Sequence, residues 1–356
     1  MKSDIPIIDS HWHLYCWQDQ NGIDFRTLID QRIKDSNLYT INICSIPIYT
    51  NIGPQQNILA ALYKLHNPKA YAYGGLVYPQ KPFQAPMPEG MDPLTQYEEL
   101  MALGFDGIKM LETKPTEQKQ FGIEIDDPYF DKLFHECEKN RTHMIWHVAD
   151  PSTFWDIEKI PKRFLDRGWF YGDGTYMSHE RIYEQVYNVL SVYPNLNVTF
   201  AHFFFMSEKP EQLKALFEKY PNVTVDITPG SEMFADFRNN HTYYRDFFTK
   251  YSHRIILGSD TSVNGGDMER FIQRGHALQT FISTDQEVTV IAESCKGLSL
   301  PQDAQERILS QNFLSAVGHE PKPIDRAALK RYVEKYKHLF SDVKMLHHIQ
   351  NEVDKF

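Results

Sequence analysis

Two histidines near the N-terminus are the first residues whose type and spacing could do chemistry. His11 and His13 are separated by one residue, and alternate residues of a β-strand face the same way, so their imidazoles would point together. Three further residues, His147, His202 and Asp260, each come at the end of an apolar, β-branched stretch. If they converge on one place, these imidazoles and the carboxylate suit a borderline divalent ion such as Zn²⁺, with an open position for water.

The elements that must position these residues are apolar segments typical of buried parallel strands. Segments of helical patterning alternate with them, and this alternation predicts a parallel sheet with helices outside. Eight strands between residues 5 and 260 fit a (β/α)₈ TIM barrel, whose active site lies at the carboxyl ends of the strands. A doubly wound sheet is the alternative, but no G-x-G-x-x-G loop follows the first strand. The strands are predicted at residues 5–9, 39–46, 70–77, 105–111, 142–148, 197–203, 222–227 and 254–260.

Two segments lie outside the regular barrel pattern. Residues 155–177, after the fifth strand, are longer than a βα loop needs and predict a loop insertion over the barrel mouth. After Gly318 the chain becomes polar and helical. We therefore predict a barrel over residues 1–318 and a helical C-terminal extension over 319–356. The extension either covers the bottom of the barrel or packs on a neighbouring subunit of a homo-oligomer.

Composition excludes several classes of function. The chain has 37 Lys and Arg against 47 Asp and Glu, and a net charge of −10 argues against a nucleic-acid partner. No apolar run approaches the roughly 18 residues of a membrane span, and the N-terminus lacks the pattern of a signal peptide. The four cysteines form no CxxC pair, so they predict neither a disulfide framework nor a thiolate zinc site. We expect a cytoplasmic protein with a small-molecule substrate and no membrane partner.

Several motifs resemble the amidohydrolase superfamily of metal-dependent barrel enzymes, specifically amidohydrolase family 2. They are IIDSHWH (7–13), GFDGIK (104–109), MIWH (144–147), FAH (200–202), LGSD (257–260) and NFL (312–314). The resemblance implies that His11, His13, His147 and Asp260 bind one catalytic metal, zinc or manganese, and that His202 polarises the substrate.

Lys109 occupies about the place where two-metal members of that family bridge their ions. Three roles stay open for it: a bridge to a second metal, a positive group facing the substrate, or a lysine in a structural ion pair. We favour a single ion, because the flanking sequence GIKM is also common in one-metal members.

The ligand set predicts a mechanism. A metal held by neutral imidazoles lowers the pKa of its bound water from 15.7 to about 7 and so makes hydroxide available. Asp260 would accept the proton and return it to the leaving group. His202 would stabilise the developing oxyanion, a contribution of about 3 kcal/mol for one donor. Asp9 is expected to orient a ligand imidazole from behind.

Substrate contacts are less defined by the sequence. Trp12 and Trp146 lie next to the proposed ligands, where an aromatic lining would indicate an apolar or ring-bearing substrate, although core packing explains them equally well. Tyr176 of the insertion could descend as part of a lid. Glu232, just beyond the seventh strand, is a further polar candidate, with a solvated loop glutamate as its alternative. Residues 203–206 are interpreted as core.

Three functions follow from these residues. The first is a metal-dependent hydrolase of a small ester, lactone or amide that uses a metal-activated water. The second is a non-oxidative decarboxylase of an aromatic or unsaturated carboxylic acid, because related barrels use the same ligand set. The third is a non-catalytic metal-binding barrel. It is disfavoured because structural zinc sites are usually closed by four protein ligands.

Overall fold

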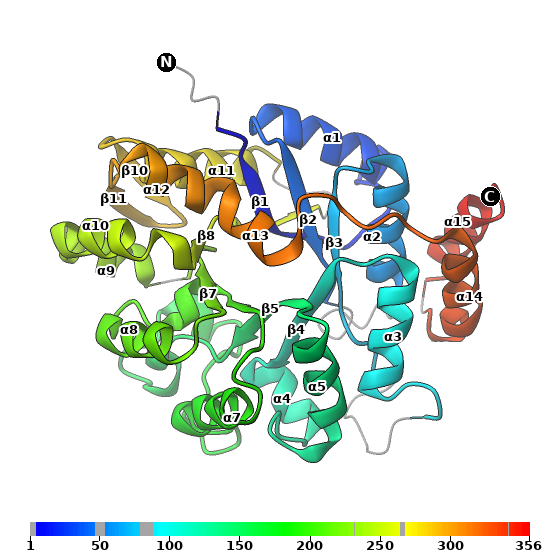
Figure 1. Ribbon diagram of the computed structural model, residues 1–356, viewed down its shortest axis with the longest axis horizontal. Helices are drawn as coiled ribbons and strands as arrows, with labels where there is room; N and C mark the ends of the chain where they lie inside the picture. The colour runs from blue at the N-terminus through cyan, green and yellow to red at the C-terminus, as the bar shows by residue number, and fades with distance from the viewer. Residues whose placement is uncertain (1–4, 47–53, 79–87, 231, 264–267, 341) are drawn as a thin grey trace.

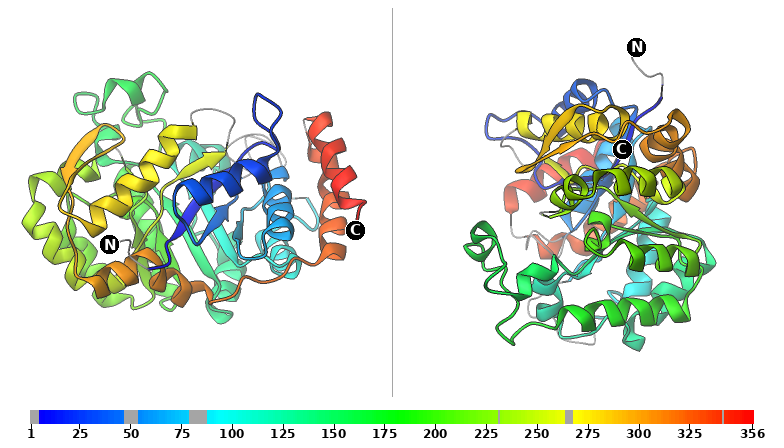
Figure 2. Two further views of the ribbon diagram at one scale, coloured as in Figure 1. Left: turned by 90° about the horizontal axis from the view of Figure 1, so that it is seen from above. Right: turned by 90° about the vertical axis from the view of Figure 1, so that its left-hand side faces the viewer.

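The computed structural model describes residues 5–46, 54–78, 88–230, 232–263, 268–340 and 342–356. A curved parallel sheet lies at the centre and helices pack around its outer face (Figures 1 and 2). Its strands are hydrogen-bonded in the order β8-β7-β6-β5-β4-β3-β2-β1-β9. This arrangement confirms the predicted barrel. The described residues contain no helix long and apolar enough to cross a membrane.

The strands are short and fully parallel within the barrel. They are β1 (Ile8–Leu14), β2 (Thr40–Cys44), β3 (Tyr71–Gly74), β4 (Gly107–Thr113), β5 (His143–Val148), β6 (Val198–Phe200), β7 (Val223–Asp226), β8 (Ile255–Ile256) and β9 (Thr261–Val263). A separate antiparallel hairpin consists of β10 (Glu287–Val290) and β11 (Glu293–Lys296).

Helices follow most strands, and most of them cover the sheet. They are α1 (Phe25–Asp35), α2 (Gln55–His66), α3 (Pro93–Leu103), α4 (Pro115–Phe121), α5 (Asp131–Lys139), α6 (Lys162–Leu165), α7 (His179–Val192), α8 (Pro210–Lys219), α9 (Met233–Asn239), α10 (His241–Lys250), α11 (Met268–Ser283), α12 (Gln302–Glu306), α13 (Asn312–Val317), α14 (Arg326–Tyr336) and α15 (Val343–Val353).

The first and eighth strands differ from the prediction. The first was expected at residues 5–9 but runs to Leu14, because Trp12 to Leu14 pair with β9 and extend the ladder. The eighth breaks after Ile256 and resumes as β9, and the Ser10 N–H bonds to the Leu257 carbonyl across the break. Asp260, in the left-handed region at φ 52°, lies in this break. The candidate histidines of β1 therefore sit within a strand that is paired on both sides.

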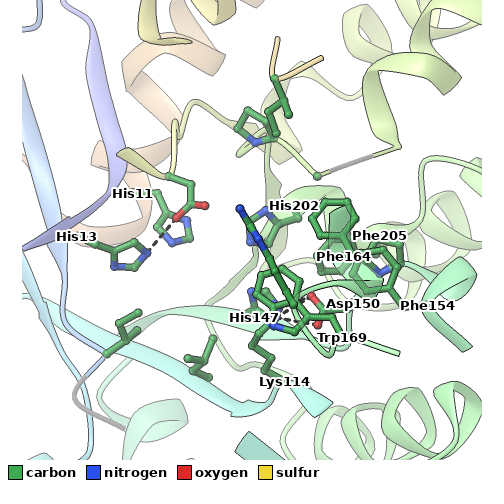
Figure 3. Close-up of a pocket in the computed structure, with 18 of the residues that line it drawn as sticks. His11, His13, Lys114, His147, Asp150, Phe154, Phe164, Trp169, His202 and Phe205 are labelled. Atoms are coloured by element: carbon green, nitrogen blue, oxygen red, sulfur yellow. Dashed lines mark hydrogen bonds and ion pairs between the residues drawn. The ribbon is translucent and has the colours of Figure 1, made fainter. Parts of the chain in front are cut away.

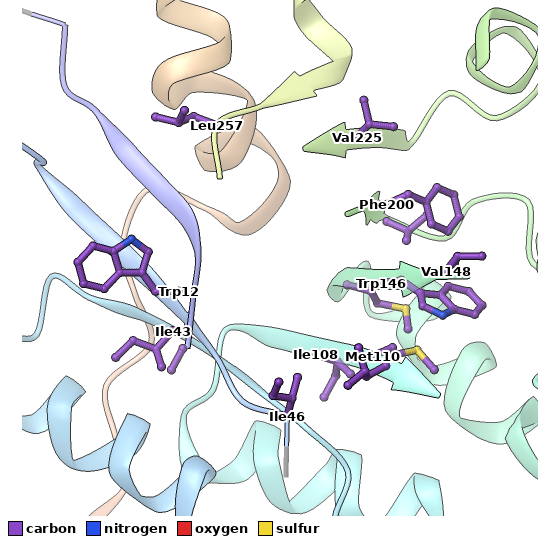
Figure 4. Packing of buried hydrophobic residues seen from close by; sticks show 14 of the residues in the cluster. Trp12, Ile43, Ile46, Ile108, Met110, Trp146, Val148, Phe200, Val225 and Leu257 are labelled. Atoms are coloured by element: carbon purple, nitrogen blue, oxygen red, sulfur yellow. The ribbon is translucent and has the colours of Figure 1, made fainter. Parts of the chain in front are cut away.

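Large apolar side chains on the outer face of the sheet pack against the helices and form the core (Figure 4). Trp12 and Trp146 belong to this layer, and they are 3% and 0% exposed. Trp146 stacks on Phe134 of α5 at 5.5 Å and donates its indole N–H to the Thr113 hydroxyl. Because successive side chains of a strand point to opposite faces of the sheet, both tryptophans point outward while the neighbouring histidines point into the barrel. Neither can contact a substrate in the barrel, so this expectation is corrected.

The C-terminal helices α14 and α15 lie on the side of the barrel, beyond α2 and α3 (Figure 1). Helix α13 lies at the end of the barrel opposite the candidate site. Its Phe313 packs inside that end, with ring centroids 5.1 Å from Tyr71 and 6.2 Å from Tyr73. Phe313, which belongs to the 1–318 segment, thus closes the bottom of the barrel. The C-terminal extension instead packs against α2 and α3.

A row of hydrogen-bonded polar side chains crosses the barrel interior close to Phe313. His143 Nδ1 lies 2.5 Å from the Tyr73 hydroxyl, and its Nε2 lies 2.7 Å from the Thr199 hydroxyl. Burial lowers the pKa of His143 to about 3, because the charged imidazolium would lose its hydration there. The residue therefore stays neutral in the folded protein over the whole range in which an exposed histidine titrates.

This neutral histidine predicts a loss of stability in mild acid. The unfolded chain, with a histidine pKa of about 6.5, takes up a proton between pH 7 and pH 3 that folded His143 does not accept. Lowering the pH from 7.5 to 5.5 should therefore cost about 1.4 kcal/mol from this residue. Urea unfolding measures this cost at both pH values. We expect the drop in unfolding free energy between pH 7.5 and pH 5.5 to be about 1.4 kcal/mol smaller in His143→Gln than in the wild type. Equal losses would contradict the assignment.

Candidate metal centre

His11, His13 and Asp260 come together at one point inside the barrel mouth. One nitrogen of each imidazole and one oxygen of the carboxylate all lie within 4.8 Å of one another. The two histidines project from alternate positions of β1, with ring centroids 5.0 Å apart, and Asp260 enters from the break between β8 and β9. His13 Nε2 is 3.1 Å from Asp260 Oδ1.

The Nδ1 atom of each imidazole is hydrogen-bonded to an acceptor. His11 Nδ1 donates to Asp226 Oδ2 at 2.9 Å, and His13 Nδ1 donates to the carbonyl oxygen of Cys44 at 2.7 Å. Each Nδ1 therefore carries a proton, and Nε2 has a lone pair whenever its ring is neutral. The arrangement is that of metal-ligating histidines held from behind. Asp226, at the end of β7, takes the orienting role that the sequence analysis expected of Asp9.

Asp9 instead supports the loop that carries Asp260. Its Oδ1 accepts the backbone N–H of Ser259 at 2.9 Å. Arg274 donates to the carbonyl oxygens of Ser259 and Asp260 at 3.1 and 3.0 Å. Burial raises the pKa of Asp260, but the hydrogen bond and charge of His13 outweigh it and hold that pKa well below its usual range. The carboxylate is therefore ionised at neutral pH.

The residues present fit a divalent cation. Two imidazole Nε2 atoms and an ionised carboxylate converge, and the 3.1 Å contact between His13 Nε2 and Asp260 Oδ1 requires either a shared proton or a cation between the two atoms. Burial also lowers the pKa of His11 well below its usual value, so this imidazole stays neutral and its lone pair stays available. Three protein ligands with space beside them are typical of catalytic rather than structural metal sites.

His147 lies in the same pocket but is not one of the three converging ligands. Its ring centroid is 4.8 Å from that of His202, while its Nε2 points to the Ala149 carbonyl at 2.8 Å and to Asp150 at 3.4 Å. Asp150 also pairs with Lys114 Nζ at 2.7 Å. Burial lowers the pKa of His147, so the ring is neutral. The structure thus places the predicted fourth ligand beside the site with one nitrogen already engaged.

His202 follows β6 in an unusual left-handed turn. Residues 202–205 all have φ between 48° and 57°, a conformation that costs roughly 1–2 kcal/mol for each residue with a Cβ. Ring packing offsets this strain: Phe204 stacks on Phe200 at 4.1 Å and Phe203 on Phe248 at 5.6 Å. These two phenylalanines and Met206 are core, as predicted, whereas Phe205 stacks on His202 and lines the pocket.

The hydrogen bonds of His202 determine which of its ring nitrogens carries the proton. The Thr228 hydroxyl donates to Asp226 at 2.5 Å, so it can only accept from His202 Nδ1, which lies 3.1 Å away. Nδ1 therefore carries the proton and Nε2 a lone pair. Burial lowers the pKa of His202 to about 3, which keeps the ring neutral. Neutral His202 thus offers the pocket an acceptor and not the hydrogen-bond donor that its predicted oxyanion role requires.

Lys109 is a second buried lysine of the pocket, beside Lys114, which is paired with Asp150. It projects from β4 among the candidate ligands, is 3% exposed, and its Nζ has no hydrogen-bond partner among the described residues. Burial lowers its pKa. A buried ammonium without a hydrogen-bond partner is costly, so the contacts of the described residues do not account for the burial of Lys109. Of the three roles left open by the sequence, the structural ion pair is not observed.

The pocket is a cavity of about 320 Å³ that the histidines share with aromatic side chains (Figure 3). The insertion, residues 155–177, does contribute to it, but through Arg163, Phe164, Arg167 and Trp169. Tyr176 packs on Tyr171 at 4.8 Å, outside the cavity lining. Glu232 is also outside this lining, although its neighbour Gly230 belongs to it. The expected contacts from Tyr176 and Glu232 are therefore replaced by residues of α6 and the turn after it.

Known proteins resemble this chain in family and fold. A family model described as amidohydrolase matches residues 79–312. An uncharacterised TIM-barrel protein from Bordetella bronchiseptica is 14% identical over 88% of this chain and 99% of its own, with a TM-score of 0.53. The 2,6-dihydroxybenzoate decarboxylase from Rhizobium is 12% identical over 88% and 98%, with a TM-score of 0.53. At these identities the likeness shows a common fold. No curated protein matches the sequence significantly.

The role of Asp226 predicts the effect of its removal. Asp226→Asn should weaken Zn²⁺ or Mn²⁺ binding by about 10- to 100-fold, because an amide is a poorer acceptor for His11 Nδ1–H and His202 N–H. Competition with a chelator measures this affinity. Asp236→Asn is the matched control, since this carboxylate on α9 accepts a hydrogen bond from the Ser207 hydroxyl and does not line the pocket. Unchanged affinity in Asp226→Asn would contradict the orienting role.

Proposed function

This chain belongs to the amidohydrolase family, and from that premise we propose that it is a metal-dependent hydrolase of a small ester, lactone or amide. The observation that supports the proposal is the convergence of His11, His13 and Asp260, with both imidazoles held so that Nε2 faces the cavity. One divalent ion, zinc or manganese, would be held by these three residues, with His147 beside them. Such an ion would supply Lewis-acid polarisation of the scissile carbonyl and of water.

Asp260 is the proposed proton carrier. Its carboxylate is ionised at neutral pH, and its side chain remains 35% exposed to the cavity. It can accept a proton as water attacks and return that proton to the leaving group, which is general base and general acid work by one residue. The hydrogen bonds to Ser259 and Asp260 backbone atoms keep the carboxylate in place during both steps.

Lys109 is the proposed stabiliser of negative charge on the substrate. The buried Nζ has no partner among the described residues, so it can donate to an oxygen on which charge develops. In the hydrolase this oxygen belongs to the scissile carbonyl. Neutral His202 would accept a hydrogen bond through Nε2 and orient a hydroxyl or water. This division of roles replaces the oxyanion role expected of His202 from the sequence.

The same lysine is the observation that favours a second candidate function. A decarboxylase needs a cationic group beside the departing carboxylate and a proton donor at the carbon that remains. Unpartnered Lys109 could serve as that cation in a non-oxidative decarboxylase of an aromatic or unsaturated acid. Two assays separate the functions: hydrolysis of a panel of lactones, esters and amides, and release of carbon dioxide from hydroxybenzoates and related acids. Activity only in the second would replace the hydrolase.

Asp260→Asn provides the direct test of the hydrolase mechanism. We expect the variant to keep its fold but to lose at least about 100-fold in kcat, because the amide cannot carry the proton. Elemental analysis of the same preparations reports the ion content. Asp285→Asn, an exposed carboxylate before β10, is the matched control.

Metal removal tests the premise shared by both functions. Chelator-treated wild type should lose turnover and regain it with one equivalent of Zn²⁺ or Mn²⁺. Full activity in metal-free protein, or full activity in Asp260→Asn, would overturn the proposal. Strong metal-dependent folding without turnover on either panel would support a non-catalytic metal-binding barrel.

A further inference from the structure

The insertion brings two arginines to the mouth of the catalytic pocket. Arg163 on α6 and Arg167 in the following turn both line the cavity that contains the candidate metal ligands. The backbone bonds Asp166 N–H to Lys162 O and Arg167 N–H to Phe164 O continue the helical turn between them. Residues four apart on such a turn lie on the same face. The two guanidinium groups therefore share the side of the insertion that faces the pocket.

These arginines differ from the other cations of the insertion in their partners. Lys159 pairs with Asp156 at 2.9 Å and Lys162 with Asp166 at 2.6 Å, so each lysine is neutralised by a neighbour in the chain. Among the described residues, Arg163 and Arg167 form no ion pair with a carboxylate. The local acidic residues thus neutralise the outward lysines and leave the charge of the pocket-facing arginines uncompensated.

Aromatic rings support both guanidinium groups. Arg163 lies 4.8 Å from the centroid of Phe164, and Arg167 lies 5.5 Å from that of Trp169. The two rings stack on each other at 5.7 Å. An arginine over an aromatic ring keeps its N–H edge free for a bidentate contact with an oxyanion. The rings therefore position the arginines and leave their donors available.

The insertion itself is anchored to the floor of the pocket. The Tyr171 hydroxyl donates to Asp150 at 2.8 Å, and Lys114, which pairs with the same carboxylate, lies 4.5 Å from the Trp169 centroid. Phe154 packs beneath the insertion at 4.8 Å from Phe164. The arginines are consequently held by a packed aromatic cluster that is tied to the segments following β4 and β5.

Charge in the pocket is unbalanced as a result. Asp150 is paired with Lys114, and Asp260 belongs to the candidate metal ligands. Arg274 is engaged with the backbone of the Asp260 loop. Lys109 inside the cavity and the two arginines at its mouth then have no carboxylate partner among the described residues. Two separate cationic positions, one buried and one on the insertion, face the same cavity.

We propose that Arg163 and Arg167 bind an anionic group of the substrate at the mouth of the pocket, remote from the bond that reacts. The substrate then carries a carboxylate or phosphate at one end and its reacting carbonyl or carboxylate at the other. The aromatic side chains that line the same cavity, among them Phe164, Trp169 and Phe205, favour a planar unsaturated or ring-bearing body. The identification of the reacting end rests on the proposed function, whereas the arginine site does not.

Binding of aromatic diacids to the purified full-length chain tests this site without turnover. Each of phthalate, isophthalate and terephthalate is titrated beside its own monoamide, which has almost the same shape but lacks the second charge. In the wild type, at least one diacid should bind at least tenfold more tightly than its monoamide. In the Arg163→Gln/Arg167→Gln double variant this preference should fall below twofold. 4-Carboxyphenyl phosphate, titrated in parallel, shows whether phosphate or carboxylate is the preferred anion.

Lys162→Gln is the matched control, because it removes one positive charge from the same helix at a side chain that is 84% exposed and paired with Asp166. It should keep the full preference for the diacid. A preference that persists in the double variant, that falls equally in Lys162→Gln, or that is absent from the wild type for all three isomers would overturn the proposal. Repeating the titrations on chelator-treated protein separates the two proposals: a diacid preference that survives metal removal supports the arginine site, even if the metal-loaded protein hydrolyses no lactone, ester or amide and the hydrolase proposal fails.

Discussion

Two buried hydrogen bonds behind the histidines of β1 are the constraint on which the site depends. Asp226 and the Cys44 carbonyl accept the Nδ1 protons of His11 and His13, and so direct both Nε2 lone pairs into the barrel. Without these acceptors either ring could turn or take its other tautomer, and the ligand set would be lost. Because the acceptors belong to β7 and β2, the site exists only when the barrel has closed around β1.

The break in the eighth strand brings Asp260 to the candidate site. An unbroken strand at this position would direct Asp260 along the regular alternation of the sheet. The interruption after Ile256 and the left-handed backbone at Asp260 instead bring its carboxylate to His13. Asp9 and Arg274 hold the interrupted segment through its backbone. The strain of this turn and of residues 202–205 lies at the candidate site, where the surrounding packing sustains it.

The insertion turns an open barrel mouth into a pocket with chemical preferences. Its aromatic cluster is fixed to the barrel through Asp150, which also lies beside His147 and Lys114. One carboxylate therefore connects the candidate metal site with the segment that faces the incoming substrate. Through this connection and its four lining residues, the insertion forms part of the pocket that holds the candidate metal ligands.

The sequence by itself determined the alternating barrel, the inward direction of His11 and His13, and the gathering of His147, His202, Lys109 and Asp260 in one pocket. These features depend on local periodicity and on the common edge at which parallel strands end, and both can be recognised from the order of residues in the chain. Only the tertiary structure decided that Asp226 orients His11, that Trp12 and Trp146 face the helices, and that His202 presents an acceptor. These features depend on contacts between residues that are far apart in the chain; His11 and Asp226, for example, are separated by 215 positions. No local pattern indicates which of several buried carboxylates will contact a given imidazole. No pattern in the sequence indicates the direction of the arginines of the insertion, because that direction is set by aromatic packing in an irregular segment without periodicity.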